Sequence, residues 1–93
     1  MKIIQSGVFI RAVKKLHKNE KQALDKVVKK IMKAPDIGDP KKGDLAGIQV
    51  YKYKVTDKQH LLAYRYDGDE IILTLLALGS HENFYRDLKK KNK

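Results

Sequence analysis

The sequence predicts an α+β fold in which one antiparallel sheet of about four strands carries an N-terminal two-helix hairpin and a C-terminal helix, in the order β-α-α-β-β-β-α. Three observations lead to this fold. Apolar residues recur with a helical period between residues 8 and 31. From Ile48 onward the period changes to two, which is typical of strands. After Gly79, Phe84 and Leu88 return to a helical spacing.

The N-terminal half is expected to contain a short strand and two amphipathic helices. Residues Lys2 to Gln5 form the strand, and Ser6 caps the next helix by accepting a backbone N–H bond. The second helix is expected to begin at Asn19, with Gln22 completing a weak capping box, and to end before Pro35. The two apolar stripes consist of Val8, Phe9, Ala12, Val13 and Leu16, and of Ala23, Leu24, Val27, Val28 and Ile31.

The C-terminal half is expected to supply the sheet. Residues 36–47 are rich in glycine, aspartate and proline and are expected to form a connecting loop. A strand from Ile48 to Val55 follows, with tyrosines on one face and Lys52 and Lys54 on the other. After a turn, the strand from His60 to Tyr66 alternates in the same way.

The last predicted strand is nearly all apolar. Asp67-Gly68 is a strong hairpin turn signal, and the run from Glu70 to Leu78 is typical of a strand at the centre of a sheet. Ser80 is then expected to cap the C-terminal helix.

Length and composition restrict the possible classes of protein. A chain of 93 residues allows one domain over residues 1–93, and 42% apolar residues is close to the globular norm of about 45–50%. The absence of cysteine excludes disulfides and thiolate metal sites, and the loop aspartates are too dispersed to bind a metal. No apolar run suits a membrane span or a signal peptide. We therefore expect a cytoplasmic protein with no membrane, metal or small-molecule cofactor.

The formal net charge is +10, from 21 Lys and Arg against 11 Asp and Glu. Self-repulsion of this size destabilises a compact state, so an anionic partner is the simplest explanation. Nucleic acid is the first candidate, an anionic membrane surface the second and an acidic protein the third. Basic helix faces are usually only solvated, but the excess charge favours phosphate contacts. The residues expected to contact RNA are Lys14, Lys15, Lys26, Lys29, Lys30, Lys89 and Lys90.

Four short runs carry a family resemblance: Gly43 to Gly47, Val50 to Val55, Leu61 to Tyr64, and Gly79-Ser80-His81 leading to Phe84-Tyr85. In this order and spacing they are similar to the RelE/ParE superfamily of type II toxin–antitoxin toxins. The resemblance covers essentially the whole chain and is greatest to the YafQ branch of the RelE-like endoribonucleases. It implies the RelE-like fold, metal-independent cleavage of the messenger in the ribosomal A site, and inhibition by a dedicated antitoxin.

The resemblance also implies roles for individual residues. His81 matches a general acid or base, and Tyr85 matches an aromatic residue that contacts the messenger. Lys52 and Lys54 match a strand where RelE-type members place cationic groups and YafQ-type members place other catalytic side chains. The chain departs from many RelE members at Leu61, where they carry an arginine and YafQ-like members carry an aliphatic residue. Arg65, on the same strand face, could take over the cationic role.

These side chains suit RNA cleavage by the substrate's own 2′-hydroxyl. The reaction needs a base for the hydroxyl, positive charge for the pentacoordinate phosphate and an acid for the leaving oxygen. Histidine, with an unperturbed pKa near 6.5, suits either proton role. Lys52, Lys54 and Arg65 would supply the charge, and Tyr85 a stacking surface worth roughly 1–3 kcal/mol per base. The alternative readings are a capping or solvated His81, a packing Tyr85 and ordinary solvated cations.

The leading hypothesis is therefore a ribosome-dependent mRNA endoribonuclease toxin, with a cognate antitoxin, the ribosome and mRNA as partners. One alternative is a ParE-like, non-enzymatic inhibitor of DNA gyrase, which does not need an acid–base residue at the His81 position. The other is a catalytically degenerate member that only binds RNA or its antitoxin, an alternative that Leu61 keeps open.

Overall fold

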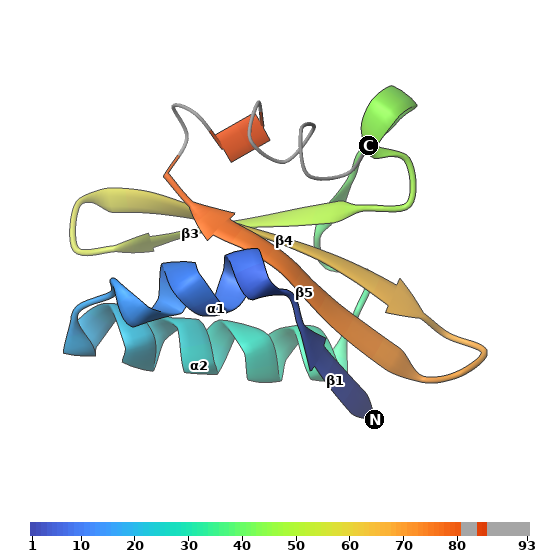
Figure 1. Cartoon of the computed structure of the whole chain (residues 1–93), viewed down its shortest axis with the longest axis horizontal. Coiled ribbons are helices and arrows are strands. Elements are labelled where there is room, and N and C mark those ends of the chain that lie inside the picture. The colour runs from blue at the N-terminus through green and yellow to red at the C-terminus, as the bar shows by residue number, and fades with distance from the viewer. Residues whose placement is uncertain (81–83, 86–93) are drawn as a thin grey trace.

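A five-stranded sheet forms the framework of the protein, which we describe from a computed structural model for residues 1–80 and 84–85. The strand order is β1-β5-β4-β3-β2, with β1 parallel to β5 and the other neighbours antiparallel. The strands are β1 (Lys2–Gln5), β2 (Asp39–Pro40), β3 (Gln49–Val55), β4 (Lys58–Asp67) and β5 (Ile72–Gly79). Helices α1 (Gly7–Lys14) and α2 (Lys18–Lys33) run below the sheet in Figure 1, and a 3-10 turn, η1 (Gly43–Leu45), precedes β3.

The predicted α+β class and helical hairpin are confirmed, but the sheet differs from the prediction in two ways. It has one strand more than expected, because the predicted loop contains β2, whose Asp39 lies opposite Val50. A two-residue strand that includes a proline leaves almost no pattern in the sequence. The sheet is also mixed, because β1 pairs in parallel with β5. Alternation shows which face a residue occupies, but it does not show the direction of the neighbouring strand.

The predicted C-terminal helix is described only at Phe84 and Tyr85, which are helical. Its other expected residues, including Leu88, lie outside the described residues. Within residues 1–80 and 84–85, no helix is both long enough and apolar enough to cross a membrane.

Ser6 starts α1 as predicted, and it also attaches the helix to the sheet. Its hydroxyl accepts a hydrogen bond from the Phe9 backbone N–H at 3.0 Å and donates one to the Leu76 carbonyl of β5 at 2.6 Å. One side chain therefore satisfies an orphan donor of the helix and fixes the angle at which the chain leaves β1.

The second helix begins one residue earlier than predicted. Its first residue is Lys18, and the Glu20 carboxylate accepts a hydrogen bond from the His17 backbone N–H at 2.9 Å. Glu20 therefore takes the capping role that we had expected of Gln22. A carboxylate is the stronger acceptor, and its negative charge in the first turn also opposes the helix dipole.

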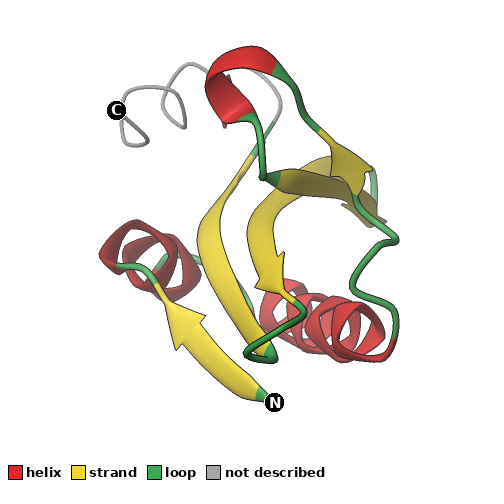
Figure 2. Cartoon of the chain, turned by 90° about the vertical axis from the view of Figure 1, so that its right-hand side faces the viewer, coloured by secondary structure: helices red, strands yellow, loops and turns green. Residues whose placement is uncertain are grey.

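The sheet separates two apolar clusters, as the alternation in β3 and β4 predicted. Figure 2 shows the backbone of the sheet and of the two helices. We call the side packed on α1 and α2 the helix face and the opposite side the back face. The helix-face cluster consists of Phe9, Leu24, Val27, Ile31, Leu62, Tyr64, Leu73, Leu75 and Leu78. The back-face cluster consists of Leu45, Ile48, Val50, Leu61, Ala63, Ala77 and Phe84.

Tyr64, which is fully buried, joins four segments through its hydroxyl group. The hydroxyl donates to the Pro35 carbonyl at 2.7 Å and accepts from the Gly38 backbone N–H at 2.8 Å. The single hydroxyl proton is used in the bond to Pro35, so the hydroxyl oxygen accepts a second hydrogen bond, from the Gln49 amide nitrogen at 3.1 Å. Burial raises the pKa of Tyr64 and keeps the phenol protonated. A Cβ at Gly38 would lie 2.5 Å from this hydroxyl, so no side chain fits there.

A second polar contact ties the start of α2 to the sheet. The Glu20 Oε2 and His60 Nε2 atoms lie 3.3 Å apart, and both side chains are largely buried. Tyr53 stacks on His60 at a centroid distance of 5.4 Å. Burial, with help from the negative charge of Glu20, raises the pKa of Tyr53 to about 12. Glu20 thus holds the N-terminus of α2 against β3 and β4.

We predict that Tyr64→Phe lowers the free energy of unfolding by about 1–3 kcal/mol, because it leaves the buried Pro35 and Gly38 groups short of a partner. Urea denaturation at equilibrium measures the change. Tyr66→Phe is the matched control, since it removes the same atom from a half-buried ring on the same face of β4. Equal losses in the two variants would contradict the role given to the Tyr64 hydroxyl.

The stabilising effect of Glu20 should depend on pH. Its pKa lies below the ordinary value of 4.5, first because the His17 N–H donates to it and then because His60, His17 and Lys58 lie nearby. A lowered folded-state pKa means that the stabilisation is present above the unfolded value and is lost as the pH falls through the folded value. Glu20→Gln should therefore be less stable than wild type at neutral pH, and the difference should shrink below pH 4.5.

Urea denaturation at several pH values tests this expectation. Glu70→Gln, which neutralises an exposed carboxylate between β4 and β5, is the control. A stability difference between Glu20→Gln and wild type that does not change with pH would count against an electrostatic role for Glu20.

Candidate nucleic-acid interface

The back face of the sheet carries three of the predicted cationic residues. Lys52 and Lys54 are exposed on β3, and their backbone positions alternate with tyrosines that point to the helix face. Lys52 lies opposite Leu61, and Leu61 lies opposite Gly79, the last residue of β5. Two strand spacings, about 10 Å, therefore separate the backbone of Lys52 from the end of β5. His81 lies outside the described residues.

Arg65 shares this face but not the immediate neighbourhood of the two lysines. It is exposed on β4 opposite Thr74, and its Nε lies 3.8 Å from the position that a Cβ would take at Gly47. Along β4 it stands four residues beyond Leu61, which corresponds to roughly 13 Å from the level of Lys52. The cations thus form a row along the strands instead of one cluster.

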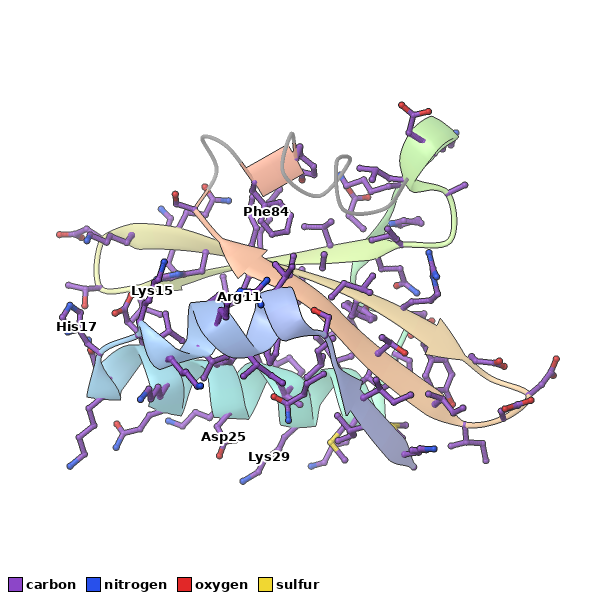
Figure 3. All side chains as sticks on the ribbon, in the orientation of Figure 1. Arg11, Lys15, His17, Asp25, Lys29 and Phe84 are labelled. Carbon is purple, nitrogen blue, oxygen red and sulfur yellow. The ribbon has the colours of Figure 1, made fainter. Side chains whose placement is uncertain are left out.

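Phe84 anchors residues 84–85 to the back face. Its ring is buried in the back-face cluster, and Figure 3 shows it pointing down onto the sheet. A Cβ at Gly79 would lie 3.4 Å from the Phe84 ring, which is van der Waals contact, so the ring lies directly against the end of β5. Tyr85, the next residue, is half-buried and packs against the same cluster. It is therefore held beside the row of cations.

Lys41 belongs to this surface although the sequence did not single it out. Its Nζ lies 5.2 Å from the centroid of the Tyr85 ring and 2.9 Å from the Asp39 Oδ2. The hydrogen bond from Lys41, followed by its charge and that of Lys52, lowers the pKa of Asp39. The pKa of Lys41 is raised, first by Asp39 and then by Tyr85. Only the pairing of β2 with β3 directs these side chains to the back face, and that pairing was not predicted.

The lysines of the helical hairpin lie on the opposite layer. The predicted RNA contacts in this layer are Lys14, Lys15, Lys26, Lys29 and Lys30, all exposed. Lys29 pairs with Asp25 at 3.9 Å, and Figure 3 shows both side chains pointing away from the sheet. Lys30 donates to the Tyr51 hydroxyl at 3.4 Å. Lys89 and Lys90 lie outside the described residues.

The described part of the surface can bind anions and stack on bases, but it holds no histidine. His60 is buried on the helix face beside Glu20, and His17 is exposed at the start of α2. Among residues 1–80 and 84–85, no three His, Cys, Asp or Glu side chains are grouped to bind a metal ion.

Comparisons with known proteins agree with this fold. The family model that describes the ParE-like toxin of type II bacterial toxin–antitoxin systems matches residues 3–89. A free mutant of the E. coli toxin RelE has a TM-score of 0.76 at 15% identity, covering 97% of this chain and 95% of its own. The E. coli RelBE toxin–antitoxin complex has a TM-score of 0.72 at 15% identity, with 87% and 96% covered.

A third solved structure, the YoeB/ParE toxin from Agrobacterium tumefaciens, has a TM-score of 0.71 at 19% identity, with 87% of this chain and 99% of that chain covered. At these identities the likeness to solved structures shows the fold alone. No curated protein matches the sequence.

Phe84→Ala should lower the free energy of unfolding by about 3–5 kcal/mol, because it removes a buried ring and leaves a cavity over Gly79 and Ala77. Thermal and urea denaturation measure the loss. Tyr85→Ala, which truncates a half-buried ring in the next position, should cost less. A smaller loss for Phe84→Ala than for Tyr85→Ala would show that Phe84 is not the anchor.

Proposed function

The chain belongs to the family of ParE-like toxins of type II bacterial toxin–antitoxin systems, and from this premise we propose that it cleaves messenger RNA on the ribosome. One observation carries the proposal: the register places exposed Lys52 level with Gly79, where β5 ends and the chain continues to His81. This register supports the proposal because Lys52 and the end of β5 stand at the same level of the sheet, and Phe84 packs on the face that carries Lys52.

The proposed mechanism assigns a role to each of these groups. The messenger lies along the back face with a base stacked on Tyr85, which Phe84 and Lys41 hold in place. Lys52 and Lys54 stabilise the negative charge on the pentacoordinate phosphate. His81 acts as general acid or base as the 2′-hydroxyl attacks and the 5′-oxygen leaves. No metal takes part in this scheme.

Arg65 has a different role from the one that its strand face suggests. Its backbone stands roughly 13 Å along β4 from the level of Lys52, which favours a separate phosphate contact. It contacts the backbone of a neighbouring nucleotide instead. The catalytic charge then depends chiefly on Lys52 and Lys54, since Leu61 is buried and apolar.

The opposite layer gives the toxin a second anionic contact. The exposed lysines of α1 and α2 bind ribosomal RNA phosphates while the messenger occupies the back face. Such contacts release counterions, so ribosome binding should weaken steeply with salt. The partner that restrains the toxin is its cognate antitoxin, as in the solved RelBE complex. An acidic segment of the antitoxin covers the basic surface.

A non-enzymatic action on DNA gyrase is the second candidate. The matching family model is named for ParE-like toxins, and Leu61 stands where many RelE members carry an arginine. A supercoiling assay with purified gyrase separates the two candidates, because a ParE-like inhibitor blocks supercoiling and leaves a ribosome-bound messenger intact.

We predict that the purified protein cleaves a ribosome-bound messenger in a primer-extension assay. His81→Ala should slow single-turnover cleavage by about 10²- to 10⁴-fold, the usual contribution of a positioned acid or base. Lys52→Met should also slow cleavage, because it removes charge from the transition state.

Lys29→Met is the control, since it removes the same charge from the opposite layer. It should weaken ribosome binding without changing the single-turnover rate at saturating ribosomes. Equal cleavage by wild type and His81→Ala would remove His81 from the mechanism. A wild type that does not cleave would refute the nuclease assignment.

A further inference from the structure

An acidic side chain lies among the cations of the back face. Asp39 stands opposite Val50, so it projects from the same face as Lys52, and its Oδ2 lies 2.9 Å from Lys41 Nζ. The Asp39 side chain is 66% exposed, whereas the Lys41 side chain is only 22% exposed. The carboxylate is thus accessible to solvent, and the ammonium group is held between Asp39 and the Tyr85 ring.

The ion pair between Asp39 and Lys41 contributes little to the free energy of folding. An exposed carboxylate gains little from a surface salt bridge, because water screens the pair. The two residues also stand only two positions apart in the chain, so the contact joins no distant segments. In a protein of net charge +10, however, an aspartate at this place reduces the positive potential around Lys41, which lies against Tyr85, and around Lys52, whose charge acts on Asp39.

A carboxylate and a phosphate present the same kind of anionic oxygen to a lysine. We propose that Lys41 is a further RNA-contacting residue of the back face, and that Asp39 occupies in the free protein the place that a backbone phosphate of single-stranded RNA takes in the complex. The proposal rests on the proposed function, because it assumes that RNA lies on this face.

The exchange has a consequence for affinity. RNA must displace Asp39 from Lys41 before the phosphate can bind, and the released carboxylate then repels the incoming backbone. Removing the charge of Asp39 therefore strengthens RNA binding instead of weakening the site. A purely structural pair predicts the opposite pattern, with a small loss of stability and no change in RNA affinity.

The test measures binding of a fluorescein-labelled single-stranded RNA to the full chain by fluorescence anisotropy over a series of salt concentrations. Asp39→Asn should bind roughly threefold to tenfold more tightly than wild type at low salt, because one phosphate contact no longer competes with a carboxylate. Asp69→Asn is the matched control, since it makes the same charge change in the exposed turn between β4 and β5.

Lys41 is tested in the same assay. Lys41→Met should weaken binding and reduce the slope of log K against log salt by about 0.7, the value for one contact to a single strand. Lys41→Arg should restore most of the affinity. In the Lys41→Met background, Asp39→Asn should increase the RNA affinity no more than Asp69→Asn does. Circular dichroism and urea denaturation establish that each variant is folded.

The outcomes separate this proposal from the proposed function. Equal affinities for Asp39→Asn and Asp69→Asn would overturn the role of Asp39, and unchanged affinity in Lys41→Met would overturn that of Lys41. A protein that shows the predicted Asp39 and Lys41 effects but does not cleave on the ribosome supports this proposal and refutes the nuclease assignment. A wild type that does not bind the RNA at low salt overturns this proposal alone, because the nuclease assignment is decided by cleavage of the ribosome-bound messenger.

Discussion

The buried hydroxyl of Tyr64 is the contact on which the arrangement of the sheet most depends. It connects the chain leaving α2 at Pro35, the turn at Gly38 and the Gln49 side chain of β3 to the middle of β4. Asp39 and the rest of β2 follow directly after Gly38, so this contact also determines where the segment leading to Lys41 begins. A hydrogen-bond network on the helix face therefore helps to position Asp39 and Lys41 on the back face.

Local patterns in the sequence predicted the features that depend on neighbouring residues. The period of two in β3 and β4 assigned each side chain to a face, and the Ser6 cap placed the start of α1, because both depend only on nearby residues. Contacts between distant segments left no comparable pattern. The pairing of β2, the parallel direction of β1 and the contact between Glu20 and His60 each join segments whose approach only the folded chain reveals.

The sequence pattern predicted the faces of the site residues but not the distances between them. Alternation correctly placed Lys52, Lys54 and Arg65 on one face, but a period of two carries no information on distance along a strand. The register shows that Arg65 stands apart from Lys52 and Lys54 and near the level of Ile48, whose carbonyl accepts a hydrogen bond from the Lys41 backbone N–H. Lys41, from a segment predicted to be a loop, lies against Tyr85. The resemblance to RelE and ParE toxins predicted the fold and the family. It could not show that Lys41 lies against Tyr85, because that contact joins segments that are distant in the sequence.

The position of β1 at the end of the sheet has a consequence for how molecules of this protein meet in solution. β1 is the outermost strand, and Ile3 and Ile4 on it are 38% and 40% exposed. An outer strand with exposed aliphatic side chains is a template for pairing with another chain. The net charge of +10 opposes such encounters between identical molecules, and salt screens that repulsion. The same charge that attracts an anionic partner thus also provides colloidal protection for the sheet's open edge.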